Sequence, residues 1–590
     1  MFFFLPYKNS GNAGPTGLCL LDSADQPCTA WNTLHIYPGR QRLESFDTPA
    51  GRLFLLGDPV WEDRNTLVQR IWASGKTGPL DESHLYEHAR GHYYWFLLQA
   101  NGIQIGNSFG AIFPVYYHTG DGAVLVSSSS FYLAEQTHAE TLERRNLLER
   151  LLFNYPLFGS TWWQGIRLLQ AHRHLKVDHT GAREEGRFAI SDYFGSGQQS
   201  SRQRLNQLTR LFEEEARLFL PDAPFGISYT GGFDGRTLVA TALHAGRDNF
   251  LTYSFGRPGA SDLRFPEAQA RARGIPYVPI LLDEKYLEGP ALESALAFMK
   301  LTEYNGNYGR PHYHYAARQL SGMVDYILTG NFGSELFRAL HQPGVMMTEC
   351  LIGVFGAGNE AWKDTLVQTA ENWAPGLFRQ ELDALIADLE DYLNPMKTWE
   401  PNHRFYQFVF QEIFRKYFGP ELVMQSHYLN NRTPFLTLRL FRELNETIWS
   451  GVHSRLFEKM KNKRLKGQMF YAAYLQRTDR QLYRQQTSKG YSPADVLEPW
   501  RLPLLFGRVL RQKLIRKEEA DSNSVETFLD RHRRALAPQR VGGATHPNDI
   551  AALLRQAAGP GDLERKICGY SIAAGWEAAG TVTQFNTTGI

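Results

Sequence analysis

Short apolar runs separated by turn-forming residues characterise the first 195 residues of this chain. Two of these runs end at Gly57-Asp58 and Asn101-Gly102, and another pair flanks Asp121-Gly122, a dipeptide that favours two-residue hairpin turns. This pattern predicts a layered, β-rich α+β domain over residues 1–195. The small, polar segment 195–201 then predicts a linker.

The spacing of apolar residues changes after residue 200. Leucine and phenylalanine recur at helical spacing between Leu205 and Phe219, and apolar runs follow at 225–229, 250–254, 277–281 and 324–328. Strands that alternate with helices predict an α/β domain with a doubly wound parallel sheet, which we place at residues 200–520. Helical spacing dominates from about residue 360, as in 380–392 and 404–417, and we expect a helical extension at 521–590.

Composition and charge narrow the functional classes. A chain of 590 residues is long enough for two or three domains, and its net charge of +2 gives no reason to expect nucleic acid as a partner. The four cysteines are too scattered to predict a disulfide framework or a zinc site. The apolar start, Met1 to Pro6, is too short for a signal peptide, and no apolar run is long enough to span a membrane. We therefore expect a cytoplasmic protein without a membrane partner.

The strongest chemical motif follows the strand expected at 225–229. It reads Thr230-Gly231-Gly232-Phe233-Asp234-Gly235 and precedes a helix. Paired glycines allow backbone N–H groups to approach a phosphate, and the start of a helix adds partial positive charge. The Thr230 hydroxyl could bond a phosphate, and the Asp234 carboxylate could bind Mg²⁺. The motif differs from a Walker loop and from a dinucleotide fingerprint.

This segment resembles the Ser-Gly-Gly-x-Asp-Ser pyrophosphate loop of the asparagine synthetase family, which is related to β-lactam synthetases and lasso-peptide cyclases. Four further segments resemble that family in the same order: 253–256, where the family places backbone groups around adenine, 328–337, with Glu335 near its end, 432–437, and 487–491, which carries Lys489. The resemblance spans about residues 200 to 500. It implies a pyrophosphate-loop fold, ATP and Mg²⁺ as cofactors, and adenylation of a carboxylate that an amine then attacks.

The resemblance also implies individual site residues. Asp234 is the expected metal ligand, and the expected catalytic residues are Lys489, Glu335 and Arg236. The expected nucleotide-binding residues are Ser228, Tyr229, Thr230, Gly231, Gly232, Asp234, Gly235, Phe255, Gly256, Thr329 and Gly330.

The N-terminal region resembles the family's glutamine amidotransferase domain, an Ntn-hydrolase-like fold, at 106–117 and at Ser127-Ser128. That activity requires a cysteine at the processed N-terminus, whereas position 2 is Phe2. The segment 56–59, Leu-Gly-Asp-Pro, stands about where the family has its glutamine-binding Asn-Gly-Glu. We therefore expect a degenerate domain without glutaminase activity.

The synthetase region departs from the family pattern as well. Ser334 replaces a metal-binding aspartate, Asn331 offers only an amide, and Arg236 replaces a serine, so its guanidinium could neutralise phosphate charge. The segment 310–315, with His312 and His314, could line an acceptor pocket. Glu303 and Asp262 are possible acids near the carboxyl edge of the sheet, although solvated or capping roles are common for such carboxylates.

Three functions stay open on the sequence. The first is an ATP-dependent ligase that joins an amine or ammonia to a small-molecule or peptide carboxylate, and ring closure within one substrate is a variant of it. The second is a nucleotide-binding protein without catalysis. The third is an asparagine synthetase that uses ammonia. Biosynthetic partner proteins would fit the first.

Overall fold

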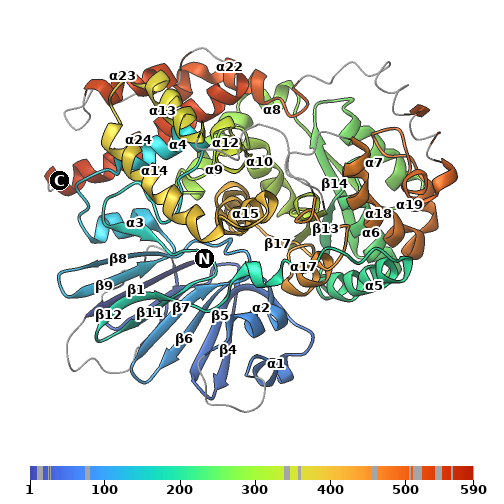
Figure 1. Ribbon diagram of the computed structural model, residues 1–590, viewed down its shortest axis with the longest axis horizontal. Coiled ribbons are helices and arrows are strands. Elements are labelled where there is room, and N and C mark those ends of the chain that lie inside the picture. Colours follow the sequence, from blue (N-terminus) through green and yellow to red (C-terminus); the bar gives the residue numbers. More distant parts are fainter. Residues whose placement is uncertain are drawn as a thin grey trace.

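The computed structural model of this chain describes residues 1–590 except 9–16, 24–25, 27, 29, 73–79, 338–345, 357–360, 455–460, 502, 504–506, 509–520, 539–547, 558, 560–561 and 589–590. Two β-sheets formed by residues before 186 lie at the lower left of Figure 1. A third sheet lies to the right, and most of the helices lie above the two N-terminal sheets.

The N-terminal region contains two six-stranded sheets. The strand order is β10-β8-β9-β1-β3-β2 in the first and β12-β11-β7-β6-β5-β4 in the second. All neighbouring strands are antiparallel except β2 and β3. The strands are β1 Phe2–Lys8, β2 Gly17–Leu20, β3 Thr33–Tyr37, β4 Arg42–Thr48, β5 Gly51–Val60, β6 Arg90–Gln99, β7 Gly102–Asn107, β8 Tyr116–Gly120, β9 Ala123–Ser127, β10 Ile166–Leu168, β11 His174–Asp178 and β12 Gly181–Glu185.

Side-chain alternation along β1 determines how these sheets stack. The ring of Phe3 lies 5.0 Å from that of Phe96 in the second sheet, whereas Phe4 on the other face lies 4.9 Å from Tyr132 of a covering helix. Two more helices cover the outer face of the second sheet. The order is helix, sheet, sheet, helix, which confirms the layered, β-rich prediction. The covering helices are α1 Arg64–Ile71, α2 Glu82–His88 and α3 Ser130–Gln136.

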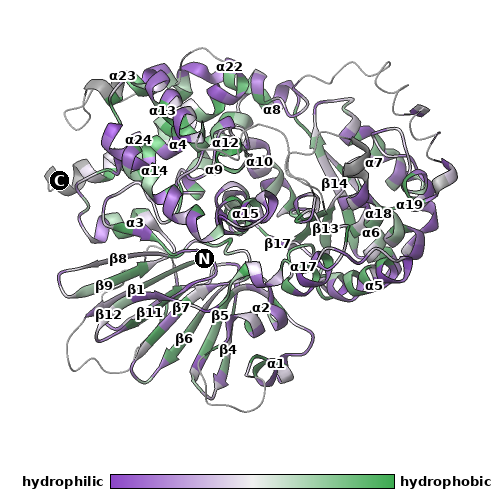
Figure 2. Ribbon diagram, viewed as in Figure 1, coloured by the Kyte–Doolittle hydropathy of each residue, from purple (hydrophilic) through white to green (hydrophobic). Residues whose placement is uncertain are grey.

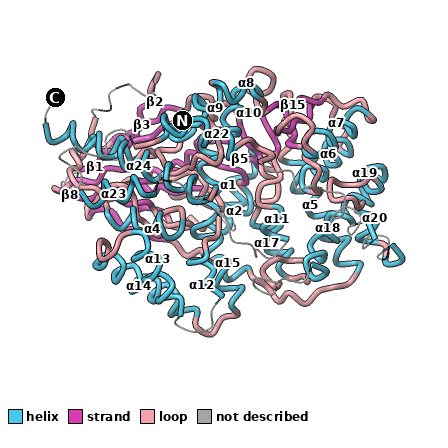
Figure 3. The backbone as a smooth tube through the Cα atoms, turned by 90° about the horizontal axis from the view of Figure 1, so that it is seen from above, coloured by secondary structure: helices cyan, strands magenta, loops and turns pink. Residues whose placement is uncertain are grey.

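The third sheet has five strands, and all neighbouring strands are parallel. Its order is β15-β14-β13-β16-β17, and β15 lies at the far end of the molecule from β8 (Figure 3). The four predicted strands start within two residues of the observed ones. The strands are β13 Phe225–Ser228, β14 Phe250–Gly256, β15 Tyr277–Leu281, β16 Tyr326–Leu328 and β17 Asn430–Arg432.

Helices cover both faces of this parallel sheet. Ile227 of β13 belongs to the same buried cluster as Leu238 of α6, whereas Ile327 of β16 points to the opposite face and packs with Leu320 of α10. The doubly wound prediction is therefore confirmed. Figure 2 shows the strands largely hydrophobic and the peripheral helices striped with hydrophilic residues, as amphipathic helices require.

The remaining helices pack around these sheets. The α-helices are α4 Arg144–Phe153, α5 Arg202–Leu218, α6 Asp234–His244, α7 Ser261–Arg271, α8 Glu284–Glu288, α9 Pro290–Leu301, α10 Pro311–Leu320, α11 Gly333–Phe337, α12 Glu349–Gly356, α13 Ala361–Trp373, α14 Arg379–Leu393, α15 Pro401–Phe408, α16 Gly419–Gln425, α17 Leu438–Asn445, α18 Lys461–Thr478, α19 Arg480–Arg484, α20 Pro493–Leu497, α22 Val525–Leu536, α23 Asn548–Ala557 and α24 Leu563–Thr588. The short 3₁₀ helices are η1 Ile190–Tyr193, η2 Asn394–Met396 and η4 Pro499–Arg501, and the π-helix is η3 Val409–Phe418.

Three features refine the sequence predictions. The helix expected at 404–417 is α-helical only to Phe408 and then continues as the π-helix η3. The expected linker is held in place, because the N–H groups of Gly197 and Gln199 donate to backbone carbonyls of the segment 445–446. The C-terminal α24 packs against α3 and α4 of the N-terminal region (Figure 1). The domain boundaries stay a prediction.

A buried ion pair joins β5 to β17 across the two regions. Arg432 Nε and Nη2 donate to the two carboxylate oxygens of Asp58 at 2.6 and 3.0 Å, and both side chains are less than one-tenth exposed. Arg42 donates to the same carboxylate at 2.8 Å, while Arg432 Nη1 donates to the carbonyl of Phe219. Both carboxylate oxygens of Asp58 and each guanidinium nitrogen of Arg432 thus have a hydrogen-bond partner, as a stable buried pair requires.

We expect Asp58→Asn to lower the free energy of unfolding by about 3–5 kcal/mol, because it leaves the buried Arg432 guanidinium beside a neutral amide. Urea unfolding followed by circular dichroism measures this. Asp47→Asn is the matched control, since Asp47 pairs with Arg52 at 3.7 Å and is 94% exposed. An equal effect of the two substitutions would contradict the structural role of the pair.

Candidate functional site

The strand order places two loops at the same crevice. The chain leaves β13 toward β14 on one side and reaches β16 on the other, so the loops that follow β13 and β16 start at adjacent carboxyl ends. Such a reversal of strand order is where open parallel sheets bind ligands. The loop 229–233 and the loop 329–332 meet there, as expected from the motifs.

Glycines permit the close contact between these loops. A Cβ on Gly330 would lie 2.5 Å from the Asp234 Cβ, and one on Gly333 would lie 2.9 Å from Asp234 Oδ1. The Ser334 hydroxyl donates to Asp234 Oδ2 at 3.1 Å. Asp234 and Ser334 are both partly exposed. The structure therefore brings the first residue of α6 into contact with the segment 328–337.

A third segment, 487–491, completes the crevice. The backbone N–H of Ser488 donates to the carbonyl of Gly231 at 3.1 Å, and a Cβ on Gly231 would lie only 2.3 Å from that of Ser488. Lys489 is the next residue and its side chain is exposed. Three segments that are separated by more than 90 residues each thus converge on one crevice.

The start of α6 has the character of an anion site. Phe233 precedes the helix and provides no side-chain cap. Among the described residues, the N–H groups of Gly231 and Gly232 have long contacts only, at 3.4 Å to Asp262 Oδ1 and 3.5 Å to Thr230 Oγ1. Their donors lie beside the positive end of the helix macrodipole, where an oxyanion is stabilised. Gly235 allows α6 to leave the strand, because a Cβ there would lie 2.3 Å from the carbonyl oxygen of Ser228.

Arg236 has a different position from the one expected of a phosphate ligand. It is fully buried, and its guanidinium donates to the carbonyls of Leu482, Gln485 and Gln486 at 2.7–3.0 Å. Burial lowers the pKa of Arg236. The prediction that it neutralises phosphate is therefore corrected, because its donors instead fix the segment that leads into Lys489.

Other expected residues are engaged in the scaffold. The Thr329 hydroxyl donates to Asn431 Oδ1 at 2.8 Å, the Tyr229 hydroxyl donates to Gln269, and the carbonyl of Gly256 accepts from the N–H of Leu282. The half-buried Glu335 lies on α11, one residue beyond Ser334. Phe255 is the penultimate residue of β14 and packs against the ring of His312 at a centroid distance of 4.9 Å.

A buried polar cluster beside Asn331 was not found from the sequence. Arg310 Nη1 donates to Glu421 Oε2 at 3.0 Å, and the Asn331 amide reaches Glu421 Oε1 at 3.4 Å. Burial raises the pKa of Glu421, and the charge on Arg310 opposes that rise. Glu421 and Arg310 are 111 residues apart in helical surroundings, so no local pattern could indicate the pair.

The residues considered as possible acids and bases lie in different parts of the structure. Asp262 lies at the crevice, beside Gly231. Glu303 lies elsewhere, where its carboxylate accepts from Ser129 and Ser130 at the start of α3. His312 is buried, which lowers its pKa to about 3, and nearby Arg310 adds to the effect. A neutral imidazole with so low a pKa is a weak general base at neutral pH.

No known family model matches the chain, and no curated protein matches it in sequence. Among solved structures, one match is the glutamine phosphoribosylpyrophosphate (PRPP) amidotransferase from B. subtilis complexed with ADP and GMP, at 14% identity and a TM-score of 0.15. The match covers 40% of this chain and 48% of that enzyme, so it spans about half of the enzyme's length. At this TM-score the match carries no argument about this chain, and the asparagine synthetase resemblance stays a prediction.

The described residues show neither a metal-binding group of side chains nor a membrane-spanning helix. Within the described ranges, no three His, Cys, Asp or Glu side chains are grouped to hold a metal ion. The described helices include none with the length and apolar character of a membrane span.

We expect Arg236→Met to increase hydrogen exchange about tenfold or more in the segment 482–491, because three carbonyls of that segment lose a buried charged donor. Mass spectrometry of peptides across this segment measures it. Arg271→Met is the control, since Arg271 is exposed and pairs only within α7. Unchanged exchange would contradict the positioning role of Arg236.

The lowered pKa of His312 also predicts a pH dependence. Because the folded state resists protonation that the unfolded chain accepts below pH about 6.5, stability falls as pH decreases toward 3. The wild type should lose unfolding free energy between pH 7.5 and pH 5, and this loss should be smaller by about 1–2 kcal/mol in His312→Gln. His179→Gln is the matched control, since His179 is exposed. Identical profiles for wild type and His312→Gln would refute this assignment.

Proposed function

We propose that this protein is an ATP-dependent ligase that activates a carboxylate by adenylation and passes the acyl group to an amine. One observation carries the proposal, namely the convergence of segments 230–235, 330–334 and 487–491 at the reversal of strand order. In the proposed reaction a carboxylate oxygen attacks the α-phosphorus of ATP and pyrophosphate leaves. The amine then attacks the acyl carbon, AMP leaves, and the amine loses a proton.

The residues of the crevice suit the phosphates of ATP. The N–H groups of Gly231 and Gly232 and of the start of α6 would donate to phosphate oxygens, and the exposed Lys489 would add a positive charge. Lysine commonly serves phosphates as a point charge. The Thr230 hydroxyl lies on the same loop and could donate to the same group.

Mg²⁺ fits the donors that are present. It usually binds proteins through one or two carboxylates and takes its other ligands from water and substrate phosphates, so a group of three acidic residues is unnecessary. Asp234 would hold it, since its carboxylate is partly exposed and has Ser334 as a hydroxyl donor. When bound, the ion would neutralise charge on the phosphates.

The N-terminal region favours an amine that is not produced by glutamine hydrolysis within this chain. Phe2 is buried against Tyr132 and offers no nucleophile. Asp58, which stands near the expected glutamine-binding segment, is engaged by Arg432 and Arg42. We propose that ammonia, a separate amine or an amine within the same substrate is used, the last leading to ring closure.

A non-catalytic nucleotide-binding protein is the second candidate. The observation that favours it is the hydroxyl of Ser334 in contact with Asp234, where the resemblance leads us to expect a second carboxylate. Pyrophosphate release tested with a panel of carboxylates and amines, including aspartate with ammonia, distinguishes the two. ATP binding without AMP formation on any substrate would leave only this second candidate.

We expect Asp234→Asn to reduce pyrophosphate release by about 10²-fold or more, if metal positioning supplies on the order of 3 kcal/mol. The Mg²⁺ dependence of ATP binding, measured by calorimetry, should weaken in parallel. Asp248→Asn is the control, since Asp248 is exposed in the loop between α6 and β14. A folded Asp234→Asn variant with unchanged Mg²⁺ dependence would refute the metal assignment.

A further inference from the structure

A cavity of about 320 Å³ lies where the N-terminal sheets meet η3 and α16. This volume is in the range of small-molecule sites. Both regions of the chain contribute to its wall. Its apolar lining includes Tyr94, Phe113, Tyr116, Trp162, Leu168 and Val423.

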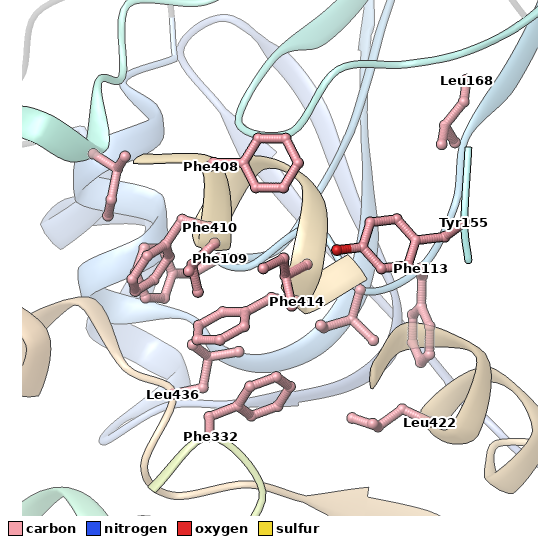
Figure 4. Close-up of a cluster of buried hydrophobic side chains, with 14 of the residues drawn as sticks. Phe109, Phe113, Tyr155, Leu168, Phe332, Phe408, Phe410, Phe414, Leu422 and Leu436 are labelled. Carbon is pink, nitrogen blue, oxygen red and sulfur yellow. The ribbon is translucent and has the colours of Figure 1, made fainter. Parts of the chain in front are cut away.

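The π-helix η3 separates this cavity from the candidate nucleotide site. Phe332, in the segment 328–337, packs against the rings of Phe414 and Phe418 at centroid distances of 4.8 and 5.3 Å. Arg415 and Lys416, on the same helix, line the cavity. Figure 4 shows Phe332 below Phe414, whereas Phe113 lies farther to the right, toward Tyr155. The cavity is therefore a separate place from the crevice at Asp234.

The charges around the cavity favour an anion. Lys300, Arg415 and Lys416 line it, and Glu303 is the one acid among the lining residues. The Glu303 carboxylate already accepts hydrogen bonds from Ser129 and Ser130. Glu412 lies close enough to Arg415 and Lys416 to compensate part of their charge, at 3.5 and 2.5 Å respectively.

One of the two buried cations, Arg415, is incompletely satisfied by the protein, whereas Lys416 Nζ donates to the carbonyl of Phe158 at 2.7 Å and to the Glu412 carboxylate. Arg415 donates from its terminal nitrogens to the carbonyls of Leu169 and Phe158, but its buried Nε–H has no partner among the described residues. Burial lowers the pKa of Lys416 to about 8, so the protonated ammonium is destabilised there. A buried donor without an acceptor costs free energy that a bound anion would offset.

We propose that this cavity binds a small organic carboxylate, with its apolar body among the aromatic side chains and its carboxylate beside Arg415 and Lys416. This site goes beyond the proposed function, because it is distinct from the nucleotide crevice and needs no ATP. The aromatic wall selects for an apolar body, and the two cations select for the negative charge.

Calorimetric titration of the full chain without nucleotide tests the proposal, using benzoate, phenylacetate and hexanoate as probes and benzamide as the uncharged match of benzoate. At least one carboxylate should bind saturably, and benzamide should bind about tenfold more weakly than benzoate or not at all. Val423→Phe should fill part of the cavity and weaken binding at least about tenfold. Val367→Phe is the control, since Val367 is 42% exposed on α13.

Thermal unfolding must show that the Val423→Phe variant is folded, and Asp234→Asn should bind the probe like the wild type. If Val423→Phe does not fold, Ser160→Leu, at another lining position, takes its place. Absence of saturable binding for all three carboxylates, equal binding of benzoate and benzamide, or unchanged binding in the cavity-filling variant would overturn the proposal. Loss of probe binding in Asp234→Asn would assign the probe to the nucleotide crevice instead.

Discussion

The order of the five parallel strands is the constraint on which the candidate site depends. Because β13 is central and its two neighbours are β14 and β16, the loops that leave β13 and β16 must share one crevice. That geometry places Asp234 against Gly330 and Gly333, where any larger residue would collide. It also directs the start of α6 and its partial positive charge toward the same point. The chemistry proposed for this chain follows from this arrangement more than from any single side chain.

Buried ion pairs join the N-terminal region to the region of the parallel sheet. Asp58 and Arg432 join β5 to β17, and Arg90 joins β6 to Glu215 of α5 through two hydrogen bonds of 2.8 and 2.9 Å. Such pairs contribute little net stability compared with apolar packing, but breaking one leaves an uncompensated buried charge. They therefore favour one relative placement of the regions. The cavity beside η3 is formed by that placement, since its wall comes from both.

The π-helix η3 lies between the two proposed ligand sites. Wide helical turns of this kind are rare and occur often at functional sites. Its aromatic residues pack on Phe332 in the segment 328–337, and its basic residues Arg415 and Lys416 line the cavity. One element thus contacts both places. Residues that were expected to act on substrate, such as Arg236, instead fix the loops around the crevice.

The sequence by itself determined the layered N-terminal region, four of the five parallel strands and the motif at Thr230 to Gly235, because apolar periodicity and glycine placement are local properties. It also identified Ser488 and Lys489 as part of a segment that belongs with the motif, through resemblance. Only the tertiary structure decided that Arg236 points at backbone carbonyls, that Asp58 pairs with Arg432, and that Glu421 meets Arg310. These contacts join residues separated by 111 to 374 positions. The packing of helices and sheets decides which of these residues meet. No local sequence pattern indicates a contact between residues so far apart along the chain.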